Sequence, residues 1–313
     1  MSNVLVVAEV IDGKVAKPTT ELLTLARGLG EPVAVVFGPA ADVAPSLAEY
    51  GAERVLEVND EAVTNYLVAP KAEALAQIAQ AENPAAVLLT SNGENKEVAG
   101  RLAIKLDSGL ITDAVGVTAE GTVQSVFAGN FTVNAQVTKG SPIVTVKPNS
   151  AAPEPAAGAG TVEQVQVTIS EAATGAKIVE TKEKQASGRP ELTEAAIIVS
   201  GGRGTDGDFT PIEGLADALG AAVGASRVAV DQGWYPHAYQ VGQTGKTVSP
   251  QLYIAAGISG AIQHRAGMQT SKAILAINKD EEAPIVEIAD LSVIGDLKTL
   301  LPDLTERVKQ AKA

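Results

Sequence analysis

The chain has 313 residues, of which 45% are hydrophobic and 19% are charged. This composition supports packed cores and excludes extensive disorder, and the length exceeds that of one typical domain, so two domains are expected. The formal net charge of −13 argues against nucleic acid or an anionic membrane as the main partner. Because the chain has no cysteine, disulfides, thiolate nucleophiles and iron–sulfur ligands are excluded, and any redox chemistry requires a bound organic cofactor.

The N-terminal residues enter a strand pattern directly, without a basic segment or a small-residue cleavage site before it. No apolar run in the sequence reaches the ~18–20 residues that a membrane-spanning helix needs. We therefore expect a cytoplasmic protein with no membrane insertion.

In the first third of the chain, short apolar runs typical of buried strands alternate with segments of helical spacing. This alternation indicates a parallel α/β sheet. The expected strands are 4–10, 32–37, 55–58 and 86–90, and the expected helices are 20–29, 42–50, 65–81 and 95–106. After Gly109 the helical segments stop, and we expect strands that extend or edge the same sheet at 115–118, 122–127, 132–138 and 143–146.

Composition marks the region between the two expected domains. Residues 149–160 are rich in Ala, Pro and Gly, which favours a flexible excursion, and a strand is expected again over 162–169. The charged segment 182–190 ends in Gly-Arg-Pro, a sequence typical of a domain boundary. The sequence thus predicts an N-terminal domain over 1–188 and a C-terminal domain over 189–313.

Strands and helices alternate again after this boundary. Thr210 is expected as an N-cap with Pro211 at the first helical position, and Ser259 as the N-cap of a later helix. Both domains are therefore expected to be α/β, each built on a mainly parallel doubly wound sheet that binds ligands beyond the carboxyl ends of its strands. The expected strands are 195–199, 227–230, 251–256, 272–278 and 285–289, and the expected helices are 210–219, 261–268 and 297–309.

Residues 202–207 read Gly-Arg-Gly-Thr-Asp-Gly and follow an expected strand. They satisfy the G-x-G-x-x-G pattern of dinucleotide-binding folds, with Asp231 at the end of the next expected strand. Residues 208–211 separate the third glycine from the helix, whereas in dinucleotide-binding folds that glycine lies at the helix–strand contact. A plain strand-to-helix turn and a nicotinamide-binding turn are both compatible with this segment.

Two other segments combine polar and basic groups near expected strand ends. Ser226 and Arg227 follow a run of small residues, and a solvated surface arginine is one interpretation of that pair. Residues 242–246 read Gly-Gln-Thr-Gly-Lys but do not complete a P-loop, because Gln240 stands where the first glycine of that motif is required. A glycine-punctuated loop is the structural alternative for this segment.

Ser259 and Gly260 stand between an expected strand and an expected helix. With Ser259 as the cap, free backbone N–H groups and the positive end of the helix would suit a phosphate or an electron-rich heterocycle. His264 would lie about one turn into this helix, and a satisfied structural histidine is the alternative reading. The other histidine, His237, is expected to be structural or exposed.

Five segments of the C-terminal half stand in an order that resembles the alpha-subunit family of electron transfer flavoproteins. The segments are 199–204, 224–227, 241–246, 257–264 and 276–280. The resemblance is dense over about residues 189–310 and looser in the first half. Five segments in the correct order are more specific than any one of them alone.

The resemblance implies that the C-terminal domain holds FAD non-covalently and that the chain carries electrons without turning over a substrate of its own. It also implies a heterodimer with a beta subunit, with residues 1–188 acting as scaffold and dimerisation surface. Electrons would come from acyl-CoA or other flavin dehydrogenases, as in fatty acid β-oxidation, and would pass to a quinone-linked oxidoreductase.

The resemblance also implies roles for individual residues. Arg203 would contact the phosphate or adenosine portion of FAD, and Arg227 the flavin ring, where a fixed cation favours electron uptake. The Thr244 hydroxyl would reach the N5 edge of the ring. His264 would lie near the N1/O2 edge, and as a histidine it is expected to change its charge near neutral pH. The full implied FAD-binding set is Arg203, Ser226, Arg227, Val241, Gly242, Gln243, Thr244, Ser259, Gly260, Ala261, Ile262, Gln263, His264, Asn278, Asp290 and Leu291.

Two other functions are compatible with parts of the sequence. One is an NAD-dependent dehydrogenase that uses the turn at 202–207, which would also need a catalytic acid or base. The other is a non-redox nucleotide-binding or assembly subunit, which would purify without flavin. Hydrolysis has no support, since no Ser-His-Asp grouping, carboxylate pair or zinc-ligand spacing stands out in the sequence.

Overall fold

The protein is described here by a computed structural model that covers residues 2–127, 129–181 and 188–312. The chain forms two compact units, one of residues 1–125 and 132–183 and the other of residues 126–131 and 184–313. Most of the predicted boundary segment, residues 182–187, lies outside the described residues. A boundary at residue 188 therefore stays a prediction.

The first unit is built on a nine-stranded sheet with the strand order β11-β5-β4-β1-β6-β10-β7-β8-β9. Its strands are β1 (Asn3–Val7), β4 (Glu31–Phe37), β5 (Arg54–Val58), β6 (Ala86–Thr90), β7 (Leu110–Thr118), β8 (Gly121–Val126), β9 (Phe131–Ala135), β10 (Ile143–Val146) and β11 (Thr161–Gln164). Pairing is parallel from β11 to β7 and antiparallel between β7 and β8. A separate two-stranded ladder joins β2 (Val10–Ile11) to β3 (Lys14–Val15).

The central strands of this sheet are apolar at most positions because both of their faces are covered. In β1, Val4 and Val6 pack into one hydrophobic core, while Leu5 and Val7 pack into the core on the other face. Side chains alternate across a strand, so a continuous apolar run buries both faces at once. This two-sided burial confirms the α/β class that the sequence predicts.

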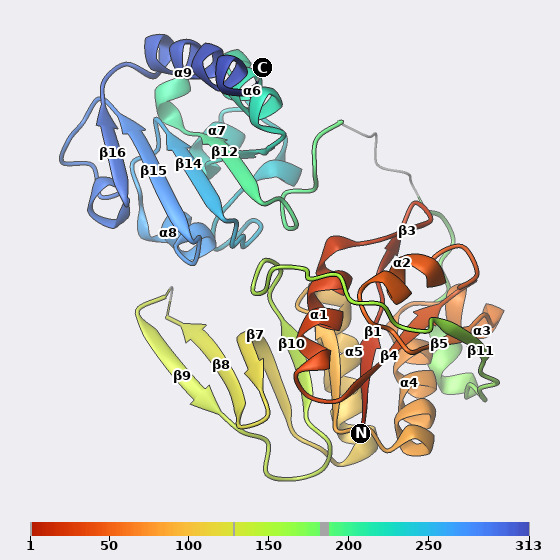
Figure 1. Ribbon diagram of the computed structural model, residues 1–313. Helices are drawn as coiled ribbons and strands as arrows, with labels where there is room; N and C mark the ends of the chain where they lie inside the picture. The colour runs from red at the N-terminus through yellow and green to blue at the C-terminus, as the bar shows by residue number, and fades with distance from the viewer. Residues whose placement is uncertain (1, 128, 182–187, 313) are drawn as a thin grey trace. The chain divides into compact units, whose positions relative to one another are not determined.

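Helices supply the outer layers of the first unit (Figure 1). Leu22 and Leu47 pack into the core that contains Val4, while Leu75 and Leu102 pack into the core that contains Leu5. The helices that carry these side chains are, in the same order, α1 (Lys17–Arg27), α2 (Ala44–Glu49), α4 (Val68–Glu82) and α5 (Gly93–Leu106), and a short helix α3 (Glu61–Thr64) precedes α4. The sheet is therefore a middle layer between two helical layers.

Two expectations for the first unit need correction. The strand expected over 143–146 does not edge the sheet, because β10 is inserted between β6 and β7 with all of its residues buried. The strand expected over 162–169 ends at Gln164. Beyond it, the backbone N–H and C=O of Thr168 both bond to the side-chain amide of Gln77, at 3.0 and 2.8 Å, instead of to a neighbouring strand.

The second unit is built on a five-stranded, fully parallel sheet with the order β13-β12-β14-β15-β16. Its strands are β12 (Ile197–Gly201), β13 (Ala222–Ala225), β14 (Leu252–Ala256), β15 (Ala273–Asn278) and β16 (Leu291–Ile294). The chain runs from β12 outward to β13 and then returns to β14 on the other side of β12. The strand order therefore reverses between β12 and β14, as in a doubly wound sheet.

Two helices cover one face of this sheet, and a third covers the other. Helices α6 (Thr210–Leu219) and α9 (Leu297–Lys312) lie side by side, with α8 (Ile262–Met268) on the opposite face (Figure 1). Leu215 and Leu301 accordingly pack into one core, and Met268 and Tyr253 into the other. The predicted mainly parallel, doubly wound architecture is confirmed in this unit.

The strand expected over 227–230 is wrong, because these residues lie in a short helix, α7 (Arg227–Asp231). Ser226 caps this helix: its hydroxyl accepts a hydrogen bond from the Ala229 backbone N–H at 3.3 Å. The strand at this place in the sheet is β13, whose four small residues end just before Ser226. Local capping thus outweighs the strand preference of the two valines in α7.

The strand expected over 285–289 is also wrong. Residues Val286–Ile288 form a single 3-10 turn, and the strand of this region is β16, which starts at Leu291. The Ile285 backbone N–H bonds to the Ser259 carbonyl at 3.1 Å, so this segment is held by a neighbouring loop. Hydrophobic composition alone does not distinguish such a buried turn from a strand.

Two predicted helix caps also differ from the structure. Helix α8 starts at Ile262 with Ala261, not Ser259, at its N-cap, because Gly260 adopts a φ of +82° and separates Ser259 from the helix. At α6, Thr210 is the first helical residue, and its backbone N–H bonds to the Asp208 carboxylate at 3.0 Å. Position along the chain places a cap only to within a few residues.

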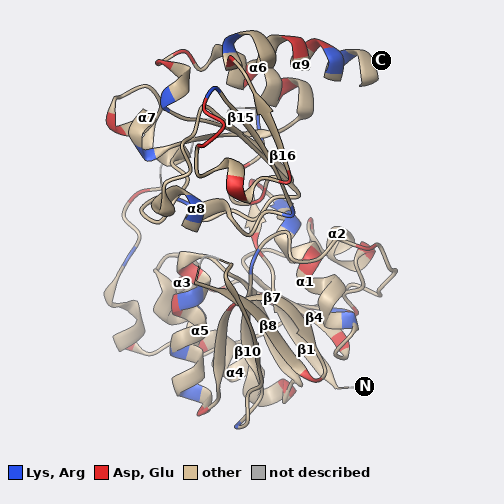
Figure 2. Cartoon of the chain, turned by 90° about the vertical axis from the view of Figure 1, so that its left-hand side faces the viewer, with Lys and Arg blue, Asp and Glu red and all other residues tan. Residues whose placement is uncertain are grey.

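Charged side chains lie mainly on the helices and loops, and most strand positions are uncharged (Figure 2). This distribution follows from the two-sided burial of the central strands, where an unpaired charge is costly. Within the described residues, no helix combines the length and the apolar character that crossing a bilayer requires.

Arg54 is the main exception to the uncharged strands, and it joins three elements of the first unit. From β5, its Nε bonds to Glu163 on β11 at 2.7 Å, and its Nη1 bonds to Glu82 at the end of α4 at 2.7 Å. Hydrogen bonds from Arg54 hold the pKa of both carboxyl groups below the usual value. The edge strand β11 is thus fastened through a shared guanidinium.

We predict that Arg54→Met lowers the free energy of unfolding by about 1–2 kcal/mol at pH 7, as expected for partly exposed charge-assisted hydrogen bonds. Depressed carboxyl pKa values contribute stability above the unfolded value of 4.5, and that contribution is lost as the pH falls through the folded values. Urea unfolding followed by circular dichroism measures the difference. Arg101→Met, which breaks an exposed pair with Glu97, is the control, and an equal loss in both variants contradicts the assignment.

Candidate functional site

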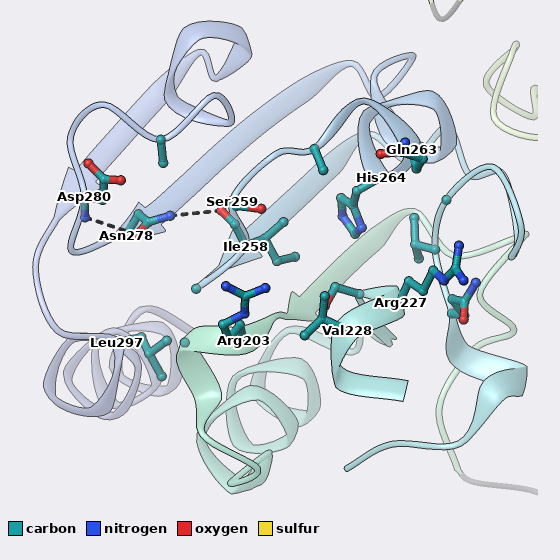
Figure 3. Close-up of a pocket in the computed structure, with 18 of the residues that line it drawn as sticks. Arg203, Arg227, Val228, Ile258, Ser259, Gln263, His264, Asn278, Asp280 and Leu297 are labelled. Carbon is teal, nitrogen blue, oxygen red and sulfur yellow. Dashed lines mark hydrogen bonds between the residues drawn. The ribbon is translucent and has the colours of Figure 1, made fainter. Parts of the chain in front are cut away.

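A cavity of about 520 Å³ lies in the second unit at the carboxyl ends of its parallel strands (Figure 3). Residues that follow each of the five strands contribute to its lining. They come from 203–206 after β12, 226–228 after β13, 257–261 after β14, 278–283 after β15 and 295–297 after β16. Ligands of doubly wound sheets bind at this edge, where loops from both sides of the strand-order reversal meet.

Two glycines form the floor of the cavity where the strand order reverses. The Gly204 backbone N–H, after β12, bonds to the carbonyl of Gly257, after β14, at 2.9 Å. A Cβ on Gly204 would lie 2.7 Å from the Gly257 Cα, and Gly257 itself has a φ of +63°. No side chain fits at this crossing, so the backbones of the two loops lie directly beneath the space that a ligand would occupy.

A second backbone contact holds the loop at 241–246 against α8. The Gln243 N–H bonds to the Gln263 carbonyl at 2.8 Å, and a Cβ on Gly267 would lie 2.3 Å from the Gly242 nitrogen. Gly242 has a φ of +143°, a conformation that favours glycine. The glycines of this loop therefore bring its polar residues to the wall of the cavity.

Two arginines lie at the cavity, and neither guanidinium group makes a strong ion pair with a described residue (Figure 3). Arg203 forms no ion pair with any described residue. Arg227 pairs with Asp231 at 3.3 Å, but the two side chains are 62% and 59% exposed, so this pair contributes little energy. Both cations are available to a phosphate or to a ring that gains negative charge.

The loop after β15 is fixed by Asn278. Its side-chain N–H group donates to the Ile258 carbonyl at 2.9 Å, and its side-chain oxygen accepts from the Asp280 backbone N–H at 3.2 Å (Figure 3). The amide therefore joins the loops after β14 and β15. In this arrangement, one of its donors and one of its acceptors are bonded to the protein. Its second N–H is left for other contacts.

His264 is buried at 6% exposure, and its two ring nitrogens differ. Nε2 lies 2.9 Å from the hydroxyl of Tyr253, while Nδ1 is enclosed without a hydrogen bond of good geometry to any described residue. Burial lowers the pKa of His264 to about 4, although the nearby backbone of Val241 acts in the opposite direction. The expectation that His264 changes its charge near neutral pH is therefore wrong, because burial keeps the imidazole neutral.

Gln240 and Thr244 form a second polar pair at the cavity. The Gln240 side chain is buried at 3% exposure and donates to the Thr244 hydroxyl oxygen at 3.0 Å. A hydroxyl has one hydrogen to donate, and accepting from Gln240 leaves that hydrogen free. Thr244 can therefore donate to a ligand in the cavity.

Most of the sequence-predicted residues are brought together around the cavity. Those that line it are Arg203, Ser226, Arg227, Val241, Gly242, Gln243, Thr244, Ser259, Ala261, Gln263, His264 and Asn278. Four others lie outside the lining: Gly260 packs against Ile285, the side chains of Ile262 and Leu291 are exposed, and the Asp290 carboxylate accepts from the Ile274 backbone N–H at 2.8 Å. Contact of all these residues with a cofactor stays a prediction.

The cavity also contains residues that sequence reasoning missed. They include Asp206, Val228, Gln240, Ile258, Lys279, Asp280, Ala283 and Leu297. Several of them follow the carboxyl ends of strands, and that position is the signal that could have found them. Leu297 also follows a strand, β16, but the sequence predicted the strand of this region at 285–289, too early in the chain to point to Leu297.

The G-x-G-x-x-G segment does not form a dinucleotide-binding turn. Gly207 has a φ of +90° and packs against Trp234, and the helix starts only at Thr210. The Asp208 carboxylate already bonds to the first N–H of that helix. A pyrophosphate would therefore meet an acid at the helix N-terminus, where dinucleotide-binding folds offer free N–H groups.

Comparison with known proteins assigns the family. A family model described as "Electron transfer flavoprotein domain" matches residues 4–171, and one described as "Electron transfer flavoprotein FAD-binding domain" matches residues 191–269. The "Electron transfer flavoprotein subunit alpha" of Mycobacterium leprae is 51% identical over 320 residues, with 100% of both chains covered. The chain belongs to the electron transfer flavoprotein alpha-subunit family.

Relatives from distant bacteria show the same full-length similarity. The "Electron transfer flavoprotein subunit alpha" of Syntrophomonas wolfei is 42% identical, with 99% of this chain and 100% of that protein covered. The protein of the same description from Bacillus subtilis is 39% identical, with 98% of each chain covered. The resemblance that the sequence motifs indicate is thereby confirmed over the whole chain.

The cofactor of this family's FAD-binding domain is FAD, and the residues of the cavity fit it. FAD combines a pyrophosphate, which needs cations, with a polar flavin ring, which needs hydrogen-bond donors and acceptors. The cavity offers the guanidinium of Arg203, the free hydrogen of the Thr244 hydroxyl and the unpartnered Nδ1 of His264. A buried polar atom without a partner needs a compensating contact, and a bound cofactor would supply it.

We predict that burial of neutral His264 makes the second unit less stable as the pH falls from about 6.5 to about 4. In this range the unfolded chain binds a proton that the folded chain does not, so the expected loss is roughly 3 kcal/mol. Urea unfolding without added FAD, followed by the emission of the single tryptophan, Trp234, measures it. In His264→Asn, the free energy of unfolding should depend much less on pH. A variant of the exposed His237 is the control and should keep the wild-type dependence. A steep dependence in His264→Asn would refute the assignment.

Proposed function

We propose that this chain is the FAD-carrying subunit of a heterodimeric electron transfer flavoprotein. It takes electrons from acyl-CoA or other flavin dehydrogenases in the cytoplasm and passes them to a quinone-linked oxidoreductase. The chain acts as a carrier and turns over no substrate of its own. The proposal is supported by membership in the family and by the character of the cavity in the second unit.

The observation that carries the proposal is the unpartnered Nδ1 of buried His264 in a cavity that also holds two weakly engaged arginines. A cavity for a neutral apolar ligand would not require these groups, because a buried imidazole nitrogen without a hydrogen bond is costly and exposed arginines at the rim favour an anionic ligand. A flavin nucleotide can satisfy them together, with its phosphates near cations and its ring edge near a neutral donor.

When bound, FAD supplies the redox chemistry, because its ring can take up and release electrons. The residues of this chain bind and orient it. Arg203 is suited to neutralise phosphate charge, and Arg227 provides a cation that favours a more negative ring. The Thr244 hydroxyl and His264 offer uncharged hydrogen-bonding groups. Such groups can stabilise negative charge on a ligand without transferring a proton to it.

The first unit is suited to a scaffold and dimerisation role. None of its described residues lines the cavity, and the FAD-contacting groups that we propose all lie in the second unit. The sheet of the first unit ends in the edge strand β9, where Val133 is exposed at 40%. An apolar edge of this kind is normally covered in the assembled state of a protein, and we propose that the beta subunit supplies that contact.

The absorption spectrum of the protein co-expressed with its beta subunit tests the proposal. We expect a visible flavin spectrum, and we expect denaturation to release FAD because no covalent link holds it. An Arg203→Ala variant should retain less FAD, since it loses the cation that we propose to neutralise the phosphate charge. A colourless complex, or one that releases a nicotinamide nucleotide, would show that the proposal is wrong.

We predict that Arg227→Ala lowers the reduction potential of the bound flavin while FAD is retained. Removal of a cation near a ring that gains electrons disfavours reduction, and about 30 mV corresponds to ~1.4 kcal/mol for a two-electron couple. Because Arg227 is largely exposed, a shift of roughly 10–30 mV is expected. Redox titration measures it against Arg307→Ala, which removes the arginine of a similar exposed pair on α9. Equal potentials in the two variants would exclude Arg227 from the site.

A further inference from the structure

Tyr253 lies behind the cavity and contacts it only through His264. The side chain projects from β14 into the core between the sheet and α8, with 0% exposure. Its hydroxyl lies 2.9 Å from Nε2 of His264, and Tyr253 does not itself line the cavity. The two side chains therefore form a buried polar pair in which only the imidazole can meet a ligand.

The direction of this hydrogen bond follows from the donors and acceptors that each partner has. A neutral imidazole carries one hydrogen, on either Nδ1 or Nε2. If Nε2 carried it, the Tyr253 hydroxyl would accept, and its own hydrogen would need another buried acceptor. The hydroxyl of Ser200 is close enough to influence the Tyr253 pKa but makes no hydrogen bond of good geometry.

The opposite arrangement satisfies more of the buried groups. Burial raises the pKa of the Tyr253 hydroxyl, which therefore keeps its hydrogen and can donate it to Nε2. His264 then carries its own hydrogen on Nδ1. This nitrogen is the one without a well-formed hydrogen bond in the protein, on a side chain that lines the cavity. The Val241 backbone lies near the imidazole and raises its pKa, but makes no hydrogen bond of good geometry to Nδ1. A buried donor without such a bond is costly, so a ligand acceptor at Nδ1 is favoured.

We propose that Tyr253 is a positioning residue whose hydroxyl fixes His264 in the tautomer with hydrogen on Nδ1, so that the imidazole presents an N–H donor to bound FAD. This inference rests on the proposed function. An acceptor atom that becomes more negative on reduction binds such a donor more strongly in the reduced state. Tyr253 thus favours the reduced flavin without touching it.

Nitrogen-15 NMR of histidine in the flavin-loaded complex tests the tautomer directly. The chain has only two histidines, so the signals of exposed His237 and buried His264 can be assigned with one variant of each. We expect the wild-type protein to show a protonated Nδ1 and an unprotonated Nε2 at His264. Tyr253→Phe, which keeps the ring and removes the hydroxyl, should give a mixture of tautomers or the opposite one.

Redox titration provides the second measurement. Tyr253→Phe should lower the flavin reduction potential, whereas Tyr235→Phe, which removes a hydroxyl bonded to Glu213 at 2.9 Å outside the cavity lining, should leave it unchanged. In a His264→Ala background, Tyr253→Phe should cause no further shift, because the hydroxyl acts only through the imidazole. A merely structural role would shift the potential with or without His264.

Three results separate the possible failures. Hydrogen on Nε2 in the wild-type protein would overturn the inference, and so would an unchanged tautomer in Tyr253→Phe with FAD bound. In both cases the proposed FAD-carrying function would stand. A complex that contains no FAD would instead refute the proposed function, whatever tautomer His264 adopts.

Discussion

The close approach of two backbones at Gly204 and Gly257 is the constraint on which the site depends. These residues follow neighbouring strands on opposite sides of the strand-order reversal, and their loops meet at 2.9 Å from N–H to carbonyl. Side chains there would separate the loops and fill the floor of the cavity. With the floor made of backbone, the polar side chains of the site stand on its walls, where Arg203 and His264 can face one ligand together.

Behind these walls, two buried side chains determine which hydrogen atoms reach the cavity. Gln240 donates to Thr244 and leaves the threonine hydrogen free, while Tyr253 pairs with Nε2 of His264 and leaves Nδ1 without a partner. Both arrangements use neutral groups in a protein whose formal net charge is −13. Directional hydrogen bonds can thus favour the binding of an anionic cofactor, which the negative net charge of the chain opposes.

Local sequence patterns predicted the α/β class and most of the strands and helices, because buried parallel strands have a clear signature. The resemblance to a family, and not the local pattern, supplied about half of the residues that line the cavity. The local patterns failed where a hydrogen bond that the hydrophobic pattern does not reveal decided the local structure. The Ser226 cap starts a helix where a strand was expected, and the segment expected as a strand at 285–289 is held as a turn by the Ser259 carbonyl. Tyr253 gave no signal at all, since its position in an apolar run reads only as core.

The chemical make-up of the cavity wall has a consequence for the durability of the protein. The described residues that line the cavity include no methionine, tryptophan or tyrosine, and the chain contains no cysteine. Met268, the last residue of α8, is fully buried in the core. Sulfur-containing side chains are the common targets of peroxide and related oxidants. Peroxide formed at a flavin in the cavity that we propose for FAD would therefore meet no sulfur-containing side chain among the lining residues.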